Sequence, residues 1–575
     1  MLWRLGSWLS VVILILVAFP VDSRAATKPN IILITVDSTR ADRMGFLGAH
    51  GGLTSNLDRI AHQGIVFLQA YSQAPTTVVS SATILTGTYP QTHQASEFVG
   101  SFAPAVPYLP DVLHANGYRT AAFVGSIQLD PRNGPFQGYE RGFDVYDAGF
   151  RQPQKGESRF QSVERHGDQV VAHATKWLVS NKQWPLFLWI HLQGPVGASG
   201  ALYDREIASA DAAVGRLVTF LRNNSLYDDA LIVVASAHGE SLGAHGENAH
   251  GIFLYDETIH VPLLLKLPKG RLAGRQTKNR ARLLDIAPTM LAEAGVSVTA
   301  QMQGQSLIRI AQATSQSDLP AYSRSELPQP GFGCSVLESW RAGKFLYIRA
   351  PKPELYDLSS DPGATSNLAQ SSKATLETMA SQLQAFDSHL GSNAGKAAEP
   401  GLTSSEMQKL ASLGYVGLQK AAAGLSAAAP GTDPKDVLPA INKTLGAIRD
   451  LEDGKAENAI ANLRQVLASQ PSMYLVQYGI GAALVQQRQY GDAIPYLHRA
   501  IELQPDSAWA HYSMGMSLMK TGDFKSSAVH LEIASERLPG FSDAHSALAE
   551  TYEHLGRELD AARERAKFSP GKAIH

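Results

Sequence analysis

Continuous apolar runs recur through the first half of the chain, and stretches with helical periodicity separate them. The runs cover residues 30–37, 120–125, 186–192, 230–236 and 261–267. Strands that are buried on both faces of a parallel sheet have such unbroken runs, whereas half-exposed strands alternate apolar and polar positions. Helical patterns lie between them, at residues 56–64, 109–117 and 203–223. This alternation predicts an α/β fold with a central, mostly parallel sheet sandwiched by helices.

Two polar residues in this region directly follow predicted strands. Asp37 ends the first apolar run, and His238 follows the fourth. Ligand sites of open α/β sheets lie beyond the carboxyl ends of the strands, so we expect these two side chains to lie there. Gly64 and Gly117 follow two of the helical patterns and are expected to end them in the left-handed conformation.

The residues beyond this region predict a smaller appended unit. A helical pattern at 283–295 precedes a β-rich stretch at 339–358, which indicates a small α+β subdomain at about residues 300–400. Residues 416–438 are rich in Ala, Gly and Pro and have no amphipathic period. That composition is typical of a linker.

The last part of the chain, residues 439–570, is a repeat. Pro471, Pro505 and Pro539 lie 34 residues apart. Small and apolar residues recur at fixed offsets before them, namely Ala447, Ala459, Leu463, Val466, Gly481, Leu484, Ala493, Leu497, Ala500, Gly515, Leu518, Ser527, Leu531 and Ala534. The pattern resembles the tetratricopeptide repeat, an all-α solenoid whose groove binds a protein or peptide. We expect three repeats and a partial one at 542–570; the alternative is a set of ordinary bundle helices.

The first 25 residues have the pattern of a secretory signal peptide. Arg4 supplies a positive charge, residues 8–19 are apolar, and small residues flank the position after Ala25. The apolar stretch is shorter than the roughly 20 residues of a membrane-spanning helix. We therefore expect cleavage near Ala25, export to the periplasm or the extracellular space, and no stable transmembrane helix. The alternative is an uncleaved anchor.

Composition narrows the functional classes. The net charge of -2 and the pI near 6.8 argue against a nucleic-acid-binding protein, which usually carries a basic excess. Cys334 is the only cysteine of the chain. Because one thiol forms neither an intramolecular disulfide nor a multi-cysteine metal site, core packing must hold the fold.

Several long motifs in the first two thirds of the chain resemble one family. They include KPNIILITVDSTRADRMG from Lys28, SSATILTGTYPQTH from Ser80, HGESLGAHGE from His238 and PELYDLSSDPGATSNLA from Pro353. Together they are similar to the sulfatase branch of the alkaline phosphatase superfamily. The resemblance covers residues 27–415 and implies that family's fold. It also implies one or two divalent metals at the carboxyl edge of the sheet and a nucleophile at the N-terminus of a helix.

The nucleophile position of the family is changed in this chain. Sulfatases make formylglycine from Cys or Ser within a Cys/Ser-x-Pro-x-Arg motif, and the resemblance places Thr77 at that position. Val79 replaces the proline, and Ser81 replaces the arginine. Thr does not mature into formylglycine, so none is expected. Phosphodiesterase and phosphoglycerol transferase relatives do use Thr as a nucleophile that a metal activates.

The resemblance implies a metal site with Asp37, Thr77 and His238 as ligands. Ala237 stands where the family has an Asp before the His. A divalent cation needs anionic oxygen ligands to offset its dehydration, and one carboxylate of two is missing. We therefore expect Zn, Mn or Ca to bind weakly or not at all.

Two more positions differ from the family after the third apolar run. Gly194 and Val196 stand where relatives often have Asp and His. Together with Ala237 and the altered nucleophile motif, these changes indicate an eroded active site on an intact framework.

A group of basic side chains remains near the implied pocket. We expect His250 and His191 as catalytic or anion-binding residues, and Arg40 and His245 as ligands of a sulfate, phosphate or carboxylate group. His250 stands where sulfatases carry a Lys that touches the ester oxygen. The alternative is that these side chains bond only to neighbouring protein groups.

Two functional hypotheses follow from these residues. The first is an exported pseudoenzyme, or a body that binds an anionic ester or glycan, with a repeat arm that binds a protein. The second is an active metal-dependent hydrolase of phosphoric or sulfuric esters that uses Thr77 as its nucleophile. The second hypothesis requires catalysis with an incomplete set of metal ligands.

Overall fold

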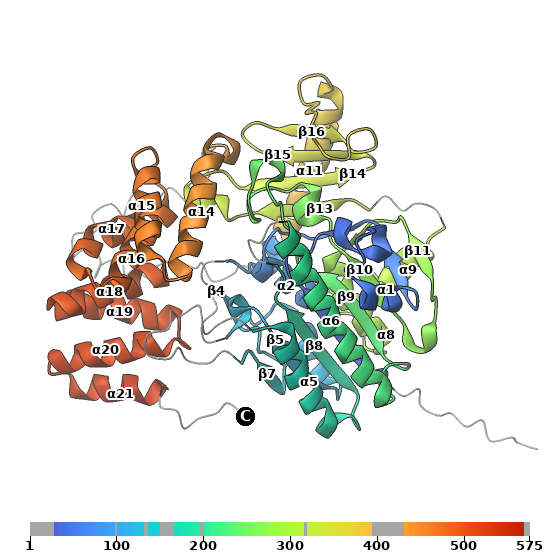
Figure 1. Cartoon of the computed structure of the whole chain (residues 1–575), viewed down its shortest axis with the longest axis horizontal. Coiled ribbons are helices and arrows are strands. Elements are labelled where there is room, and N and C mark those ends of the chain that lie inside the picture. The colour runs from blue at the N-terminus through green and yellow to red at the C-terminus, as the bar shows by residue number, and fades with distance from the viewer. Residues whose placement is uncertain are drawn as a thin grey trace, which may run out of the picture.

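The computed structural model describes residues 28–97, 100–131, 136–149, 165–195, 200–314, 319–393 and 431–568. Figure 1 shows a body that contains the sheets and a helical arm that lies beside it. The predicted signal peptide at residues 1–25 and Val196 lie outside the described residues. No helix within the described ranges is long and apolar enough to span a membrane.

The body is built around an eight-stranded sheet that contains all five predicted runs. From edge to edge the strands are β11 (Arg275–Thr277), β2 (Ile65–Phe67), β10 (Leu263–Lys266), β9 (Leu231–Ser236), β1 (Ile31–Val36), β8 (Leu186–Leu192), β5 (Arg119–Val124) and β7 (Val145–Asp147). The sheet is mostly parallel, as predicted, and β1 pairs with β8 and β9. Unlike the other predicted runs, β10 is antiparallel to its neighbours. A strand buried on both faces has the same apolar run in either direction, so the run does not reveal direction.

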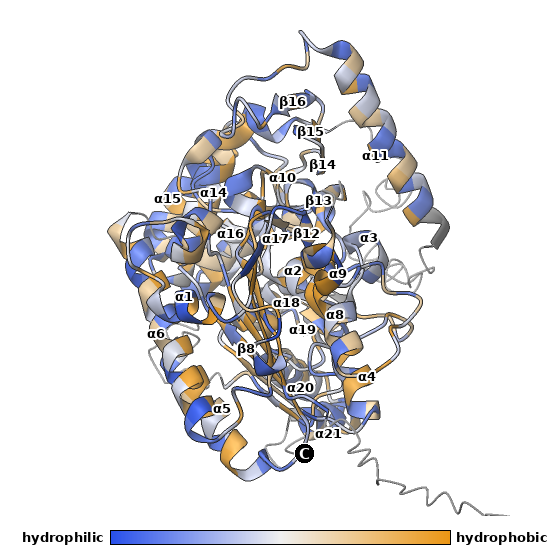
Figure 2. Ribbon diagram, turned by 90° about the vertical axis from the view of Figure 1, so that its right-hand side faces the viewer, coloured by the Kyte–Doolittle hydropathy of each residue, from blue (hydrophilic) through white to orange (hydrophobic). Residues whose placement is uncertain are grey.

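Helices cover both faces of this sheet, as the alternating pattern predicted. One face packs against α2 (Thr77–Thr86), α4 (Leu109–Ala115) and α8 (Ile286–Glu293). The other face packs against α1 (Ser55–Ala61), α5 (Gly167–Asn181) and α6 (Ala201–Asn223). Side chains of β1 alternate between the two cores, with Ile31 in the first and Ile32 in the second. Figure 2 shows the central strands as strongly hydrophobic and the outer helices as mixed.

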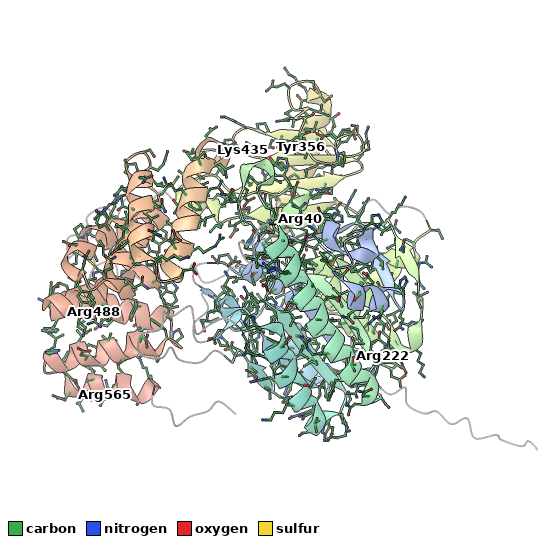
Figure 3. The ribbon with its side chains drawn as sticks, viewed as in Figure 1. Arg40, Arg222, Tyr356, Lys435, Arg488 and Arg565 are labelled. Carbon is green, nitrogen blue, oxygen red and sulfur yellow. The ribbon has the colours of Figure 1, made fainter. Side chains whose placement is uncertain are left out.

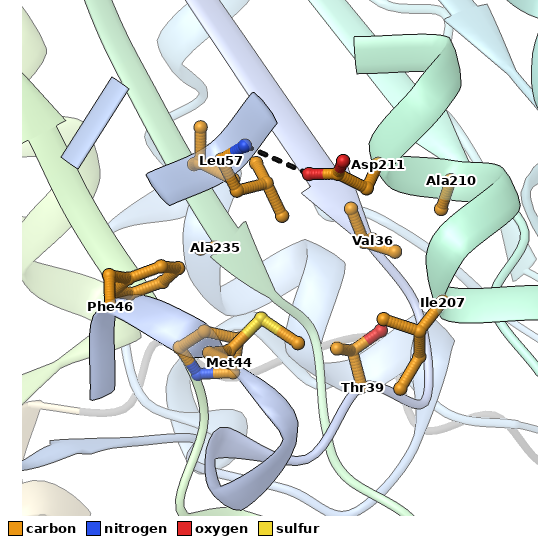
Figure 4. Close-up of a pocket in the computed structure, with 11 residues that line it drawn as sticks. Val36, Thr39, Met44, Phe46, Leu57, Ile207, Ala210, Asp211 and Ala235 are labelled. Carbon is orange, nitrogen blue, oxygen red and sulfur yellow. Dashed lines mark hydrogen bonds between the residues drawn. The ribbon is translucent and has the colours of Figure 1, made fainter. Parts of the chain in front are cut away.

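Helix α1 begins on a carboxylate that α6 supplies. Asp211 accepts a backbone N–H bond from Asn56 at 3.0 Å and another from Leu57 at 2.8 Å. Figure 4 shows the bond from Leu57. A negative group at a helix N-terminus satisfies free N–H groups and interacts favourably with the helix dipole. A cavity of about 10 Å³ lies beside this contact, lined in part by Val36 and Ala235. A cavity of that size holds at most about one water molecule. The core beside the Asp211 contact is therefore closely packed.

Gly117 and Gly64 follow their helices for different reasons. Gly117 has a φ of +83°, the left-handed conformation predicted after α4. Gly64 does not have a positive φ. A Cβ at Gly64 would lie 2.7 Å from the carbonyl oxygen of Leu265 in β10. Gly64 therefore permits a close approach of two chain segments, and its predicted role as a left-handed cap is wrong.

The predicted small α+β subdomain is present. Its antiparallel sheet has the order β13 (Ala321–Ser325), β14 (Leu337–Ala342), β15 (Phe345–Arg349) and β16 (Glu354–Asp357). Trp340 and Tyr347 of this sheet share a core with Met379 and Leu383 of α11 (Lys373–Asn393).

Shorter elements elsewhere are β3 (Ala70–Tyr71), β4 (Gly100–Ser101), β6 (Phe136–Gln137), β12 (Ala281–Arg282), α3 (Pro90–His93), α7 (Asp256–Ile259), α9 (Leu307–Gln312) and α10 (Pro328–Phe332).

The arm is a series of four helix pairs within the described residues. The pairs are α14 (Leu438–Glu452) with α15 (Ala456–Leu467), α16 (Tyr474–Gln486) with α17 (Tyr490–Leu503), α18 (Ala508–Thr521) with α19 (Phe524–Arg537), and α20 (Ser542–His554) with α21 (Glu558–Phe568). The predicted packing positions are buried. The stretch predicted as a partial repeat forms a complete pair.

The predicted linker, residues 416–438, is described only from residue 431. There, Pro434–Val437 forms a 3-10 helix and α14 begins at Leu438. Thr432 forms a β-bridge with Cys334 of the body. The last part of this stretch is therefore attached to the body, because tertiary contacts override its linker-like composition.

We predict that Gly481→Ala destabilises the arm, because a Cβ at Gly481 would lie 2.6 Å from Cγ and Cδ2 of Leu497. Leu497 is fully buried, so the overlap should lower the free energy of unfolding by about 1–3 kcal/mol. Gly491→Ala in the same repeat is the control, since a Cβ there meets no atom within 4 Å. Thermal unfolding should give a lower Tm for the first variant only; equal Tm values would contradict this packing.

Candidate functional site

Four buried side chains meet at the start of helix α2. Asp37 follows β1, His191 lies in β8, His238 follows β9, and Thr77 is the first residue of α2. Thr77 Oγ1 donates a hydrogen bond to Asp37 Oδ2 at 2.6 Å and lies 3.2 Å from His238 Nε2. His191 Nε2 and His238 Nε2 lie 3.5 Å and 3.4 Å from oxygens of the Asp37 carboxylate. The structure therefore brings these four predicted site residues together.

The hydrogen bonds of His238 determine which of its nitrogens carries a proton. Nδ1 lies 2.8 Å from the carbonyl oxygen of Gly239, which only accepts, so Nδ1 donates. Burial and the nearby charge of His250 lower the pKa of His238 to about 4. The ring is therefore neutral at neutral pH, and the lone pair of Nε2 faces the hydroxyl of Thr77.

Two buried polar atoms of the cluster have no hydrogen-bond partner among the residues that the structure describes. They are Oδ1 of Asp37 and Nε2 of His191. The other nitrogen of His191, Nδ1, lies 2.9 Å from Thr35 Oγ1. Burial raises the pKa of Asp37, but His238, His191 and the Thr77 hydroxyl outweigh burial and lower it. The cluster thus holds one ionised carboxylate next to two imidazoles.

A second carboxylate sets the charge of His250. Glu240 is fully buried, and its Oε2 lies 2.8 Å from Nδ1 of His250. The ring of His250 lies 4.2 Å from the ring of His238, centroid to centroid. Burial lowers the pKa of His250, but Glu240 outweighs burial and raises it to about 9. His250 is therefore an imidazolium beside a neutral imidazole. In the sequence, Glu240 is marked only by its position two residues after His238. The sequence does not indicate that Glu240 bonds to His250.

A third carboxylate lies on the N-terminus of α2. Glu97 Oε1 accepts backbone N–H bonds from Val78 at 2.9 Å and from Val79 at 3.4 Å. Free N–H groups and the helix dipole make this position favourable for an anion. Burial raises the pKa of Glu97 above its usual value, and it outweighs the hydrogen bond from Thr76, the two N–H bonds and the charge of His250, which lower the pKa. No local sequence signal points to Glu97, because only the folded chain brings residue 97 to the start of α2.

Four stretches of the chain match known protein families. Residues 29–296 match the Sulfatase family, and residues 246–388 match the family described as N-sulphoglucosamine sulphohydrolase, C-terminal. Residues 445–508 and 484–551 match tetratricopeptide repeat families. The body is a sulfatase-family domain. Tetratricopeptide repeats follow it, so both resemblances drawn from the motifs are confirmed.

Curated relatives match parts of this chain. Arylsulfatase K of Homo sapiens is 32% identical over 183 residues, which make up 29% of this chain and 33% of the relative. The uncharacterized sulfatase YidJ of Escherichia coli K12 is 22% identical over 424 residues, or 59% of this chain and 83% of the relative. The chain thus spans about a third of the length of the first curated relatives that it matches.

Solved structures share the fold of the sulfatase-family domain. A protein solved in complex with its substrate D-glucosamine-2-N,6-O-disulfate has a TM-score of 0.52 at 19% identity, covering 64% of this chain and 99% of that one. The phosphonate monoester hydrolase of Agrobacterium radiobacter has a TM-score of 0.51 at 20% identity, covering 63% and 96%. These likenesses establish a common fold.

The positions that depart from the family pattern are tightly packed. Ala237 is fully buried beside His238. A Cβ at Gly194 would lie 1.6 Å from the carbonyl oxygen of Asp37, so an acidic side chain has no space there. Ser81 Oγ, at the position of the family's Arg, is buried and has no hydrogen-bond partner among the described residues. At Gly194 the backbone of Asp37 therefore occupies the space that a side chain would need.

The site offers few oxygen ligands to a divalent metal, although Asp37, His191 and His238 lie together beside Thr77. Within the described ranges, no group of three or more His, Cys, Asp or Glu side chains is placed to hold a metal ion. Asp37 is the one carboxylate among the four central side chains, while Glu240 and Glu97 bond to His250 and to α2. A hard dication such as Ca²⁺ requires more oxygen ligands than this set offers.

The predicted anion ligands Arg40 and His245 point elsewhere. The Arg40 guanidinium bonds to the Asp42 carboxylate and donates to the carbonyl oxygens of Glu240 and Ser241. The ring of His245 stacks on Tyr255, with centroids 3.6 Å apart. No recorded contact joins either side chain to the Thr77 cluster within the described residues. Arg40 supports the loop that carries Glu240, and this is the alternative role expected for a retained basic residue.

We predict that Glu240→Gln lowers the pKa of His250 from about 9, because Glu240 contributes most to opposing the effect of burial. Histidine-selective NMR across pH 5–10 measures this pKa directly. The raised pKa also stabilises the fold: this contribution is complete below about pH 6.5 and is lost as pH rises through about 9. Glu257→Gln is the control, since Glu257 lies near His245 instead. An unchanged His250 pKa would contradict the pairing.

Proposed function

We propose that this chain is an exported sulfatase-family protein that binds an anionic group at the Thr77 site without hydrolysing an ester, and whose arm binds a protein or peptide. The observation that carries the proposal is the carboxylate of Glu97 on the N–H groups at the start of α2, near the His250 imidazolium. A carboxylate from the chain itself occupies this position, so the position suits an anion.

The missing metal ligands support binding without turnover. Ala237 supplies no oxygen, and Gly194 leaves no space for a carboxylate. Activation of a Thr hydroxyl in the phospho-type relatives requires a metal that lowers its pKa. We therefore propose that Zn, Mn or Ca binds weakly or not at all.

Several observations support the rest of the proposal. A structural neighbour was solved with a disulfated glucosamine as its substrate, which favours a sulfated glycan or another anionic ester as the ligand here. Tetratricopeptide grooves hold peptides or helices. The pattern of residues 1–25 favours export with cleavage near Ala25.

The arrangement around Thr77 supports an alternative, an active ester hydrolase. The Thr77 hydroxyl lies at a helix N-terminus, and Asp37 Oδ2 accepts its hydrogen bond at 2.6 Å. His238 Nε2, at 3.2 Å, presents a second acceptor. Either group could take the hydroxyl proton as the Thr77 oxygen bonds to a sulfur or phosphorus centre and the ester oxygen leaves with its bonding electron pair. The imidazolium of His250 would face the negative charge that develops.

One experiment separates the two functions. The protein is purified from the exported fraction, where its first residue should lie near Ala26, and its metal content is measured. Aryl sulfate, aryl phosphate and phosphodiester substrates are then offered with Zn²⁺, Mn²⁺ or Ca²⁺. We expect substoichiometric metal and no turnover. Stoichiometric metal, with turnover that Thr77→Val abolishes and Thr83→Val on the same helix retains, would establish the hydrolase instead.

We also predict that Glu97→Gln strengthens the binding of inorganic sulfate, because the substituted side chain no longer competes as an anion for the N-terminus of α2. The dissociation constant measured by calorimetry should fall about tenfold, equivalent to about 1.4 kcal/mol. Glu140→Gln, at an exposed position, is the control and should leave it unchanged. Equal or weaker binding by Glu97→Gln would show that sulfate does not bind where Glu97 lies.

A further inference from the structure

The junction between body and arm is held by a set of polar contacts. The Asp433 carboxylate accepts backbone N–H bonds from Lys352 and Lys435, each at 3.0 Å. The Lys435 ammonium forms an ion pair with Glu354, and Tyr356 donates its hydroxyl hydrogen to the same carboxylate. Figure 3 shows Lys435 and Tyr356 next to each other at this junction. The start of the arm therefore has a defined position on the body.

The first helix of the arm also contacts a loop of the sulfatase-family domain. Asn442 of α14 donates from Nδ2 to the carbonyl oxygen of Gly246 at 2.7 Å. Its Oδ1 accepts the backbone N–H of Asn248 at 3.2 Å. Leu438 of the same helix packs on Gly246, since a Cβ there would lie 3.0 Å from Leu438 Cδ2. One amide side chain thus bonds to the loop backbone on both sides of Glu247.

This loop connects the two members of the Glu240–His250 pair. Backbone bonds inside it join Ser241 N to Ala249 O and Gly243 N to Glu247 O, both at 2.8 Å. These bonds fold the loop back on itself, so that His250 returns to the Glu240 carboxylate. A shift of residues 246–248 would therefore move His250 relative to Glu240.

The Glu247 side chain connects the loop to the residues that follow His250. Its carboxylate accepts the backbone N–H groups of Ile252 at 2.9 Å and Phe253 at 3.2 Å. The residues on both sides of Glu247 are the ones that Asn442 holds. The contact from the arm thus reaches the segment on each side of His250.

We propose that Asn442 is a positioning residue of the Thr77 site, through which the first repeat helix holds the Glu240–His250 loop in its anion-binding geometry. This inference rests on the proposed anion binding and names the part of the chain that regulates it. Because coupling is reciprocal, a ligand of the arm that displaces α14 changes the anion affinity of the body, and an anion in the site changes the affinity of the arm.

The contact can be removed without detaching the arm. Ile441 of α14 is fully buried, and Leu475 of α16 packs on Gly331 of the body, where a Cβ would lie 3.0 Å from Leu475 Cδ1. Asn442 itself is only partly buried. The variant Asn442→Leu keeps the number and branching of the side-chain heavy atoms and removes both hydrogen bonds. Lys443→Ala, at the next and exposed position of the same helix, is the matched control.

Hydrogen–deuterium exchange of peptides covering residues 241–253 measures the order of the loop. We expect Asn442→Leu to raise exchange in these peptides about tenfold, because the backbone loses its external partners. Its Tm should match that of Lys443→Ala, whose loop should exchange as in the natural protein. Unchanged exchange in Asn442→Leu would overturn the positioning role.

Calorimetry with inorganic sulfate provides the functional readout. Asn442→Leu should weaken sulfate binding about threefold to tenfold, and Lys443→Ala should not. Increased loop exchange with unaltered sulfate affinity would overturn the link to the site. If the natural protein binds no sulfate, the proposed function fails, and the exchange measurement alone still decides whether Asn442 holds the loop.

Discussion

The parallel pairing of β1 with β8 and β9 is the constraint on which the site depends. Val36 is paired with Leu192 on one side and with Ser236 on the other, and Asp37 N donates to the Leu192 carbonyl at 3.1 Å. Parallel ladders fix neighbouring strands along their whole length. The carboxyl ends of β1, β8 and β9 therefore lie side by side at one edge of the sheet. A slip of one residue would turn His191 to the opposite face of the sheet and away from Asp37.

Burial and the neighbouring carboxylates determine which histidine of the site is charged. His238 and His250 lie with ring centroids 4.2 Å apart, and both rings cannot be protonated in a buried space without strong repulsion. Glu240 bonds to His250 and makes that ring the charged one, so His238 stays neutral. The proposed anion site therefore combines an imidazolium with the N-terminus of α2. In the proposed function, Glu97 would compete with the ligand for the N-terminus of α2.

The arm and the body share contacts that extend to this site. A tetratricopeptide repeat buries its own core between neighbouring helix pairs, and here the first pair also bonds to the body. The bonds from Asn442 reach the loop between Glu240 and His250, while Lys435 pairs with Glu354 of the small subdomain. A partner of the repeats and an anion in the body would thus act on one connected structure, which is the physical basis for the coupling we propose.

Periodic patterns and local motifs in the sequence by themselves determined the sheet strands, the helical layers, the small subdomain and the repeats, because burial imposes a period on each element and the repeats impose a period of their own. They also indicated Asp37 and His238, which follow predicted strands, and Thr77, which lies three residues before the family motif that begins at Ser80. Only the tertiary structure decided the direction of β10, the close approach at Gly64 and the position of Glu97 on α2. These features depend on which distant segments touch, and contact between distant segments leaves no periodic signal along the chain.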